Sequence, residues 1–208
     1  MRSRAKITVF VSLLIILSLA LSQGNNALAT KAEEEAALKT ARVMTTELLK
    51  RTKGMLVKLL HEGDMLKAIT VCAIAVPEIM AEFNSKPHHT IKRTSVKYRN
   101  PANMPDYYER KILEEMQSLA DKGRLTPEFE SIDVVTENDD ITYLRYMKPL
   151  RVEKPCLNCH GPSENIAPEV MKFLAKFYPD DRARDFKEGD LRGAVSVKIA
   201  LKFPENQP

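Results

Sequence analysis

Between residues 30 and 62 the apolar positions recur every three or four residues, which is the period of an amphipathic helix. The members of this stripe are Leu38, Met44, Leu48, Leu49, Met55, Leu56, Leu59 and Leu60. Thr30 and Glu33 have the spacing of a capping box, and the acidic residues 33–35 suit the positive end of a helix dipole. We therefore expect one long helix that starts after Thr30 and ends or bends at Gly63.

A second helical pattern starts at Asp64, a suitable N-cap, and is interrupted by Pro77. A short helix through Phe83 is expected to follow. Residues 88–99 alternate instead and are rich in β-branched side chains, which predicts a strand. The prolines within residues 100–105 then require irregular backbone.

Residues 106–122 form the next helical pattern, and Gly123 is placed to end it. The predicted buried side of this helix consists of Tyr107, Ile112, Leu113, Met116 and Leu119. A further short helix is expected over residues 170–177.

Strand character returns in three segments of the second half of the chain. Residues 131–136 and 141–151 flank the polar stretch Glu137–Asp140, which favours a hairpin. Residues 191–201 alternate and predict a final strand. The order of elements predicts an α+β fold, with a small antiparallel sheet flanked by helices and a long N-terminal helix.

The first 29 residues have the three parts of a secretory signal peptide. Arg2, Arg4 and Lys6 precede an apolar stretch over residues 7–21, and Ala27-Leu28-Ala29 is an A-x-A cleavage site. We expect residues 1–29 to be removed and residues 30–208 to form a single domain in the periplasm. An uncleaved membrane anchor is the alternative, although about fifteen apolar residues are few for a span.

The charge of the chain changes with this cleavage. The whole sequence carries a formal charge of +4, and subtracting Arg2, Arg4 and Lys6 leaves +1. A nearly neutral chain gives no reason to expect nucleic acid or any strongly charged partner.

Cys156-Leu157-Asn158-Cys159-His160 is a C-x-x-C-H motif, the attachment signature of a c-type haem. The two thiols can add to the two vinyl groups of one haem, and the histidine becomes the proximal ligand of the iron. Gly161 lets the backbone leave this face without a side-chain clash. Zinc binding and a Cys156–Cys159 disulfide are the alternatives. Zinc needs further ligands, and a disulfide leaves His160 without a role.

The chain has three cysteines, so haem attachment leaves Cys72 alone in an oxidising compartment. From the residues alone, Cys72 is either a ligand or a small apolar core residue within Val71-Cys72-Ala73-Ile74. Other candidate ligands of the iron are Met80, Met104, Met147, His61, His88 and His89.

With these residues placed, the chain resembles the single-haem, c-type PAS-like domains that were first catalogued as a domain of unknown function. The resemblance rests on four stretches, which together span most of the chain after residue 30. These are residues 67–77 around Cys72, Arg93 to Asp106 (RTSVKYRNPANMPD), Cys156 to Gly161, and Glu188 to Ala194 (EGDLRGA). The resemblance implies a PAS-like sheet, with His160 and Cys72 as the two axial ligands of the iron.

Arginine forms bidentate pairs with carboxylates, so basic residues near the motif are candidates for the haem propionates. Arg93 and Arg99 are the first choices, and Lys97 and Arg192 are further candidates. An ordinary charged strand face explains each of them equally well.

The function that follows is a periplasmic haem protein that senses redox state or a small ligand through loss of the Cys72 bond. The alternative is a low-potential electron carrier. An enzyme is not expected, because two protein ligands fill the iron's axial positions. The expected partners are haem and an unknown signalling or redox protein, with a homodimer as a possibility and a membrane only if the signal peptide stays uncleaved.

Overall fold

The computed structural model describes residues 29–137 and 139–202. Residues 1–28, which hold nearly all of the expected signal peptide, lie outside the described residues, so its cleavage stays a prediction. From Ala32 onward the described residues form one compact unit. Within that described part, no helix is both long and apolar enough to cross a membrane.

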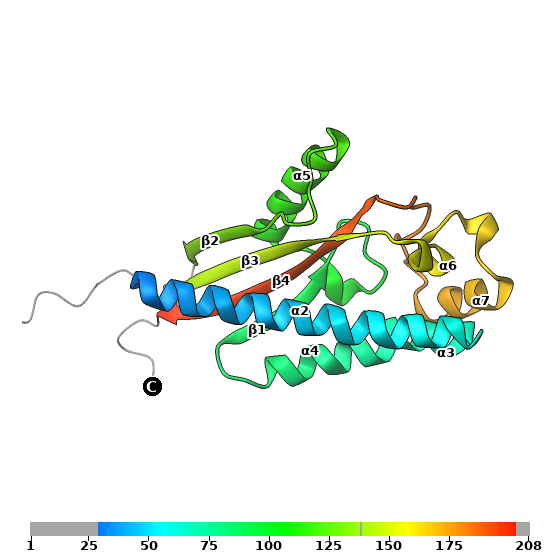
Figure 1. The fold of residues 1–208 in the computed structure, drawn as a ribbon, viewed down its shortest axis with the longest axis horizontal. Helices are drawn as coiled ribbons and strands as arrows, with labels where there is room; N and C mark the ends of the chain where they lie inside the picture. The colour runs from blue at the N-terminus through cyan, green and yellow to red at the C-terminus, as the bar shows by residue number, and fades with distance from the viewer. Residues whose placement is uncertain (1–28, 138, 203–208) are drawn as a thin grey trace, which may run out of the picture. The chain divides into compact units, whose positions relative to one another are not determined.

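Four strands of the described chain make one antiparallel sheet in the order β1-β4-β3-β2 (Figure 1). Their bounds are His89–Thr94 for β1, Ser131–Thr136 for β2, Thr142–Arg151 for β3 and Leu191–Lys202 for β4. Ile91 of β1 pairs with Val197 of β4, and Val197 pairs with Tyr146 of β3. The predicted α+β class with a small antiparallel sheet is therefore confirmed, and the last strand of the sequence lies at its centre.

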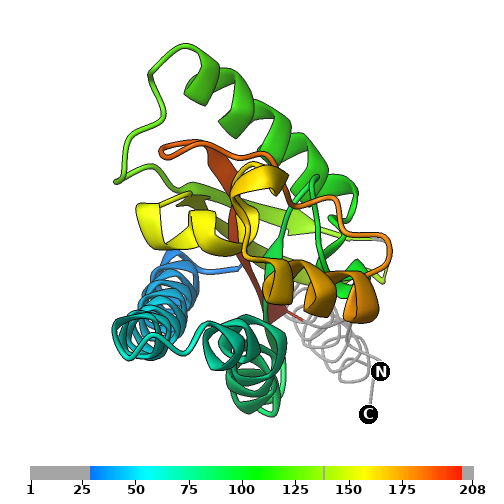
Figure 2. The same ribbon diagram turned by 90° about the vertical axis from the view of Figure 1, so that its right-hand side faces the viewer.

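One face of the sheet is covered by two helices, α2 (Lys31–His61) and α4 (Val76–Asn84). They lie side by side on this face (Figure 2). The core between helices and sheet contains Ala41, Met44, Leu48, Val76, Ile79, Ile91, Leu144, Tyr146, Val195 and Val197. Alternate residues of a strand point to the same face, which is why Leu144 and Tyr146 face α2 while their neighbours face the opposite side. The long N-terminal helix expected from the periodicity is confirmed.

Helix α5 (Tyr107–Asp121) covers the other face and buries Ile112, Leu113 and Met116 against Met147 of β3. The expectation that Tyr107 belongs to this buried side is wrong, because its side chain is 90 % exposed. Tyr107 is the first residue of the helix, and the inward position of that turn belongs to Glu109, which is 2 % exposed.

Beyond β3, the chain forms short helices at the end of the sheet that faces the viewer in Figure 2. These are a 3-10 turn at Lys154–Cys156, α6 (Leu157–His160) and α7 (Pro168–Phe177). Helix α3 (Met65–Thr70) packs against α7 through Ile69, Val170 and Leu174. This packing sets the C-x-x-C-H motif beside the helices that follow α2.

Strand β1 is shorter than the strand predicted over residues 88–99. The chain leaves the sheet after Thr94, because Ser95 N–H donates to the carbonyl of Asn103 and closes residues 95–103 into a loop. At the other end His88 has a positive φ of 67°, so the strand starts one residue later. The alternation of β-branched residues continues into the loop, but they no longer pair with β4.

Candidate functional site: a cavity that gathers the motif, Cys72 and three arginines

A cavity of about 600 Å³ lies among the C-terminal half of α2, the helices that follow it, β1 and the motif. Its wall includes the motif residues Cys156, Cys159 and His160, together with Cys72, Arg93, Arg99 and Arg192. Much of the remaining wall is apolar and comes from Leu49, Leu56, Leu60, Ile69, Met80 and Leu150. The volume is in the range of cofactor sites, which are typically about 300–1,000 Å³.

The short helical turns at 154–160 point the motif toward the cavity. Cys156 closes the 3-10 turn and Cys159 and His160 belong to α6, so the three side chains line the cavity together. Gly161 ends α6, and a Cβ there would lie 2.7 Å from the carbonyl oxygen of Leu157. The role predicted for Gly161 therefore has a steric reason.

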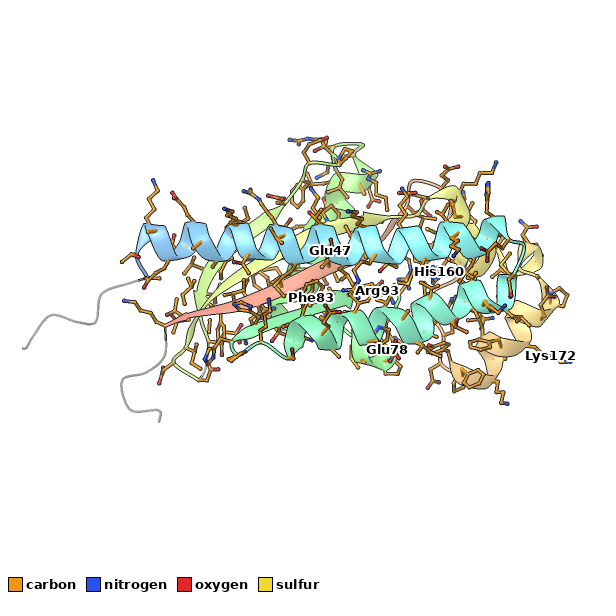
Figure 3. The ribbon with its side chains drawn as sticks, turned by 60° about the horizontal axis from the view of Figure 1, so that its bottom comes forward. Glu47, Glu78, Phe83, Arg93, His160 and Lys172 are labelled. Atoms are coloured by element: carbon orange, nitrogen blue, oxygen red, sulfur yellow. The ribbon has the colours of Figure 1, made fainter. Side chains whose placement is uncertain are left out.

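His160 is held by its Nδ1 atom, which donates to the carbonyl oxygen of Ala183 at 2.7 Å. A ring that donates through Nδ1 keeps its lone pair on Nε2, the form that binds a metal. Burial, with further contributions from Arg192 and Arg99, holds the pKa of His160 well below its usual value near 6.5. Phe186 packs edge-on against the imidazole, with 6.3 Å between ring centroids. Figure 3 shows His160 and Arg93 in the space between α2 and the helix that follows it.

The two motif thiols are buried enough to stay protonated at neutral pH. Burial raises the pKa of Cys156, and it raises the pKa of Cys159 to about 11. All three cysteines of the chain are free thiols. Addition to vinyl groups needs reduced, unpaired cysteines, and a disulfide would block it.

Cys72 lies on a π-helical turn, Val71–Ala75, which connects α3 to α4 without a break. The N–H of Val76 donates to the carbonyl of Val71, five residues earlier, and therefore not to Cys72. The next possible donor is Pro77, which has no N–H. The carbonyl of Cys72 accepts instead from Nη2 of Arg93 at 3.2 Å. Such turns occur frequently at functional sites.

The sequence prediction that Pro77 interrupts the helix was correct only in part. The helix continues, but it changes its hydrogen-bonding pattern just before Pro77. A proline five residues after Cys72 was the available signal for this turn, because it removes the donor that the Cys72 carbonyl would otherwise have.

The three arginines in the cavity wall differ in how their donors are used. Nη1 of Arg192 donates to Ser95 Oγ and to the Lys97 carbonyl, each at 3.0 Å. Burial, followed by the charges of Arg93 and Arg99, lowers the pKa of Arg192 to about 10. Nε of Arg93 is buried without a hydrogen-bond partner. This concentration of positive charge favours an anionic occupant.

Arg99 uses its guanidinium differently. Its Nε donates to Asp181 at 3.1 Å, and its Nη2 donates to the carbonyls of Cys159 and Ala183. Asp181 and Ala183 were not found from the sequence, because nothing local distinguishes them. Lys97, also predicted near a carboxylate, donates its Nζ to the carbonyl of Arg184.

The other candidate ligands of the iron lie in different parts of the structure, and most lie outside the cavity. Met80 lines the cavity, whereas Met147 is fully buried on the α5 face of the sheet and Met104 is 47 % exposed outside the cavity wall. His61 lines a neighbouring hollow of about 510 Å³, and His88 and His89 stand at the start of β1. Across residues 29–137 and 139–202, no group of three or more His, Cys, Asp or Glu side chains is placed to hold a metal ion.

Comparison with known proteins finds one family model and one solved structure that are similar to this chain. The family model described as "Tll0287-like: Tll0287" matches residues 24–200. A solved structure entitled "Crystal structure of the cyanobacterial heme-protein Tll0287" has a similar fold, with a TM-score of 0.58 and 24 % sequence identity. The similarity covers 76 % of this chain and 94 % of that one. No curated protein matches the chain in sequence.

Proposed function

The chain belongs to the Tll0287-like family, and we propose that it is a c-type haem protein that attaches one haem in the cavity through Cys156 and Cys159. The observation that carries the proposal is that both motif cysteines, His160 and Cys72 line one cavity although they are up to 88 residues apart. The structural neighbour is described as a heme-protein, which supports the same cofactor.

The residues of the cavity fit a haem in three respects. Leu49, Leu56 and Leu60 of α2 supply an apolar wall for the porphyrin. The two thiols are not paired in a disulfide, so both are available for addition. Arg93 keeps a buried donor free, and Arg192 carries charge that burial destabilises, so both gain from a carboxylate partner.

His160 and Cys72 are the proposed axial ligands. His160 offers Nε2 because Nδ1 is engaged by Ala183. Cys72 comes from a different element, the π-helical turn, and its carbonyl accepts a hydrogen bond from Arg93 of β1. When bound, haem iron supplies one-electron redox chemistry, and a thiolate ligand favours its ferric state.

This arrangement suits a redox-responsive module better than a catalyst. Reduction of a bound haem would weaken its preference for thiolate, and release of Cys72 would free the π-helical turn to shift. The movement of that turn against β1 is the proposed signal. The proposed location is the periplasm, on the strength of the signal peptide, and the receiving partner is a separate protein of unknown identity. We also propose that the sheet with its flanking helices is a PAS-like domain.

An electron carrier is the second candidate. It is favoured by the bonds that Arg99 makes to the carbonyls of Cys159 in the motif and of Ala183, the partner of His160, because these would limit reorganisation on the His160 side. The two functions differ at Cys72, because a carrier keeps the same ligands in both oxidation states.

The test uses the full chain, exported and matured in a periplasmic host. Haem that resists extraction into acidified organic solvent supports covalent attachment, and Cys156→Ala and Cys159→Ala should each impair it. Ferric, ferrous and ferrous–carbon monoxide spectra then report the ligands. Cys72→Ala should keep the haem but convert ferric iron from low-spin to high-spin or water-ligated. Thr70→Ala, a matched change on the preceding turn, should leave the spectrum unaltered. Extractable haem in the unmodified protein would overturn the proposal.

A further inference from the structure

Two segments far apart in the sequence run alongside each other behind the motif. Arg182 N–H donates to the carbonyl of Tyr98 at 3.1 Å, and its guanidinium lies over the Tyr98 ring at 5.1 Å. Lys97 Nζ donates to the carbonyl of Arg184 at 2.7 Å. Residues 97–99 therefore hold residues 181–184 beside the cavity.

Arg99 and Asp181 form the buried centre of this contact. Their side chains are 10 % and 0 % exposed, and Nε of Arg99 lies 3.1 Å from Oδ1 of Asp181. The same Oδ1 accepts from the N–H of Ala183 at 2.9 Å, and Oδ2 accepts from Nε of Arg184 at 3.0 Å. Asp181 therefore fixes both the guanidinium of Arg99 and the backbone of Ala183.

The carbonyl oxygen of Ala183 receives two donors. One is Nδ1 of His160 at 2.7 Å, and the other is Nη2 of Arg99 at 3.2 Å. A carbonyl oxygen has two lone pairs and can accept both. A charged donor on one lone pair draws electron density from the oxygen, so the bond from His160 is weaker than it would be with an unshared carbonyl.

The strength of the Nδ1–H bond matters because it sets the basicity of the other nitrogen of the ring. A strong acceptor at Nδ1–H gives the imidazole partial imidazolate character, which makes Nε2 a better donor to ferric iron. Arg99 opposes this effect. The loop is also attached to the motif without Arg99, because Phe186 N–H donates to the His160 carbonyl and Asp185 N–H donates to the Gly161 carbonyl, each at 3.0 Å.

We propose that Arg99, held by Asp181, is a positioning residue that limits the electron donation of His160 through their shared Ala183 carbonyl, and is not a propionate anchor. The proposal rests on the proposed function, because it concerns the ligand strength of His160 toward haem iron. It goes beyond that function by assigning a tuning role to a residue whose donors are directed at Asp181 and at the carbonyls of Cys159 and Ala183.

The experiment uses ferrous protein in a Cys72→Ala background, where the iron–imidazole stretching frequency can be read by resonance Raman spectroscopy. Arg99→Met should raise this frequency. It should also favour the ferric state by about threefold, which is a fall of about 28 mV in midpoint potential at 59 mV per tenfold change for one electron.

The matched control is Arg93→Met, which removes the same charge from the same cavity wall but leaves the Ala183 carbonyl untouched. It should change the potential without moving the iron–imidazole frequency. The double variant Arg99→Met/Asp181→Asn removes both charges of the buried pair together, so it keeps the net charge and should still raise the frequency. It also serves if Arg99→Met alone fails to fold.

The inference is overturned if the frequency is the same with and without Arg99, or if Arg93→Met raises it equally. Failure of the proposed function looks different. In that case the parent protein shows no covalently held haem and no iron–imidazole band in any variant.

Discussion

Nη2 of Arg93 donates to the carbonyl oxygen of Cys72 across 3.2 Å, joining the C-terminal end of β1 to the π-helical turn. The N–H of Val76 donates to the Val71 carbonyl, and Pro77 has no N–H to offer to Cys72. The geometry of Cys72 therefore depends on a side chain from another element. A substitution at Arg93 should therefore alter the position of Cys72, the candidate ligand, without any substitution of the cysteine itself.

Arg93→Met should make Cys72 easier to displace. Loss of one hydrogen bond of about 1 kcal/mol corresponds to roughly a fivefold lower half-saturating concentration of imidazole. The measurement is an imidazole titration of the ferric protein followed by its absorption spectrum. Arg51→Met removes an arginine that pairs with Glu82 of α4 at 2.8 Å but does not touch Cys72, and it should leave the titration unchanged. Equal titrations for Arg93→Met and the unmodified protein would show that the turn holds Cys72 unaided.

Pro77→Ala should disturb the same turn from the opposite direction. The new N–H can donate to the carbonyl of Ala73, which favours an α-helical pattern and rotates Cys72 relative to the helix that follows. The expected result is a loss of low-spin ferric iron at neutral pH. Pro168→Ala is the matched control, because Pro168 also lies in the first turn of a helix, α7, but away from Cys72. An unaltered spectrum for Pro77→Ala would mean that tertiary packing, rather than the missing donor, sets the turn.

Two glycine substitutions should have opposite effects on stability. Gly54 lies within α2, and a Cβ there would meet nothing within 4 Å, so Gly54→Ala should stabilise the fold by about 0.5–1 kcal/mol.

Gly193 has a φ of +149°, and a Cβ there would clash with the carbonyl oxygen of Thr94. Gly193→Ala should therefore destabilise the fold by roughly 1–3 kcal/mol or prevent it. Urea unfolding measures both. A destabilised Gly54→Ala would indicate that α2 must bend at this residue.

Stability should fall in acid, because the half-exposed Asp106 and the buried Asp181 are held ionised by arginines. Burial acts to raise the pKa of Asp106, but the Glu109 N–H and Arg145 outweigh it and hold this pKa below its usual value. Burial also acts to raise the pKa of Asp181, but the hydrogen bond and the charge of Arg99 outweigh it and hold this pKa below its usual value. A carboxyl whose folded pKa is lowered adds stability above its unfolded pKa near 4, and this stability is lost as the pH falls through the folded pKa.

The measurement is the urea midpoint between pH 7 and pH 3. It should hold from pH 7 to about 5 and drop below about 4, where the unfolded carboxyls take up protons first. Asp106→Asn should lower the midpoint at pH 7, since Arg145 is 3 % exposed and loses a partner at 2.7 Å, and it should flatten the acid slope. A slope identical to that of the unmodified protein would exclude Asp106 as a contributor.

The strands were predicted well where side-chain alternation and pairing coincide. The predicted segment 131–136 is β2 without change, and the hairpin with β3 follows directly. The prediction failed where alternation continued past the last paired residue, as in β1, because a loop that closes between Ser95 and Asn103 leaves no trace in a residue pattern. Tyr107 was misplaced for a similar reason: helical periodicity does not show that Glu109 takes the inward position of the first turn.

The sequence by itself determined the elements, the motif and the candidate ligands, because these depend on spacing along a few neighbouring residues. C-x-x-C-H is readable in five positions, and a long amphipathic helix is readable from its period. Only the tertiary structure showed that Cys72 and His160 line one cavity and that Arg99 pairs with Asp181. It also showed that Met147, a candidate ligand, faces α5 on the opposite side of the sheet. Those relations join residues up to 88 positions apart, and they arise from how helices pack on a sheet, which no local pattern encodes.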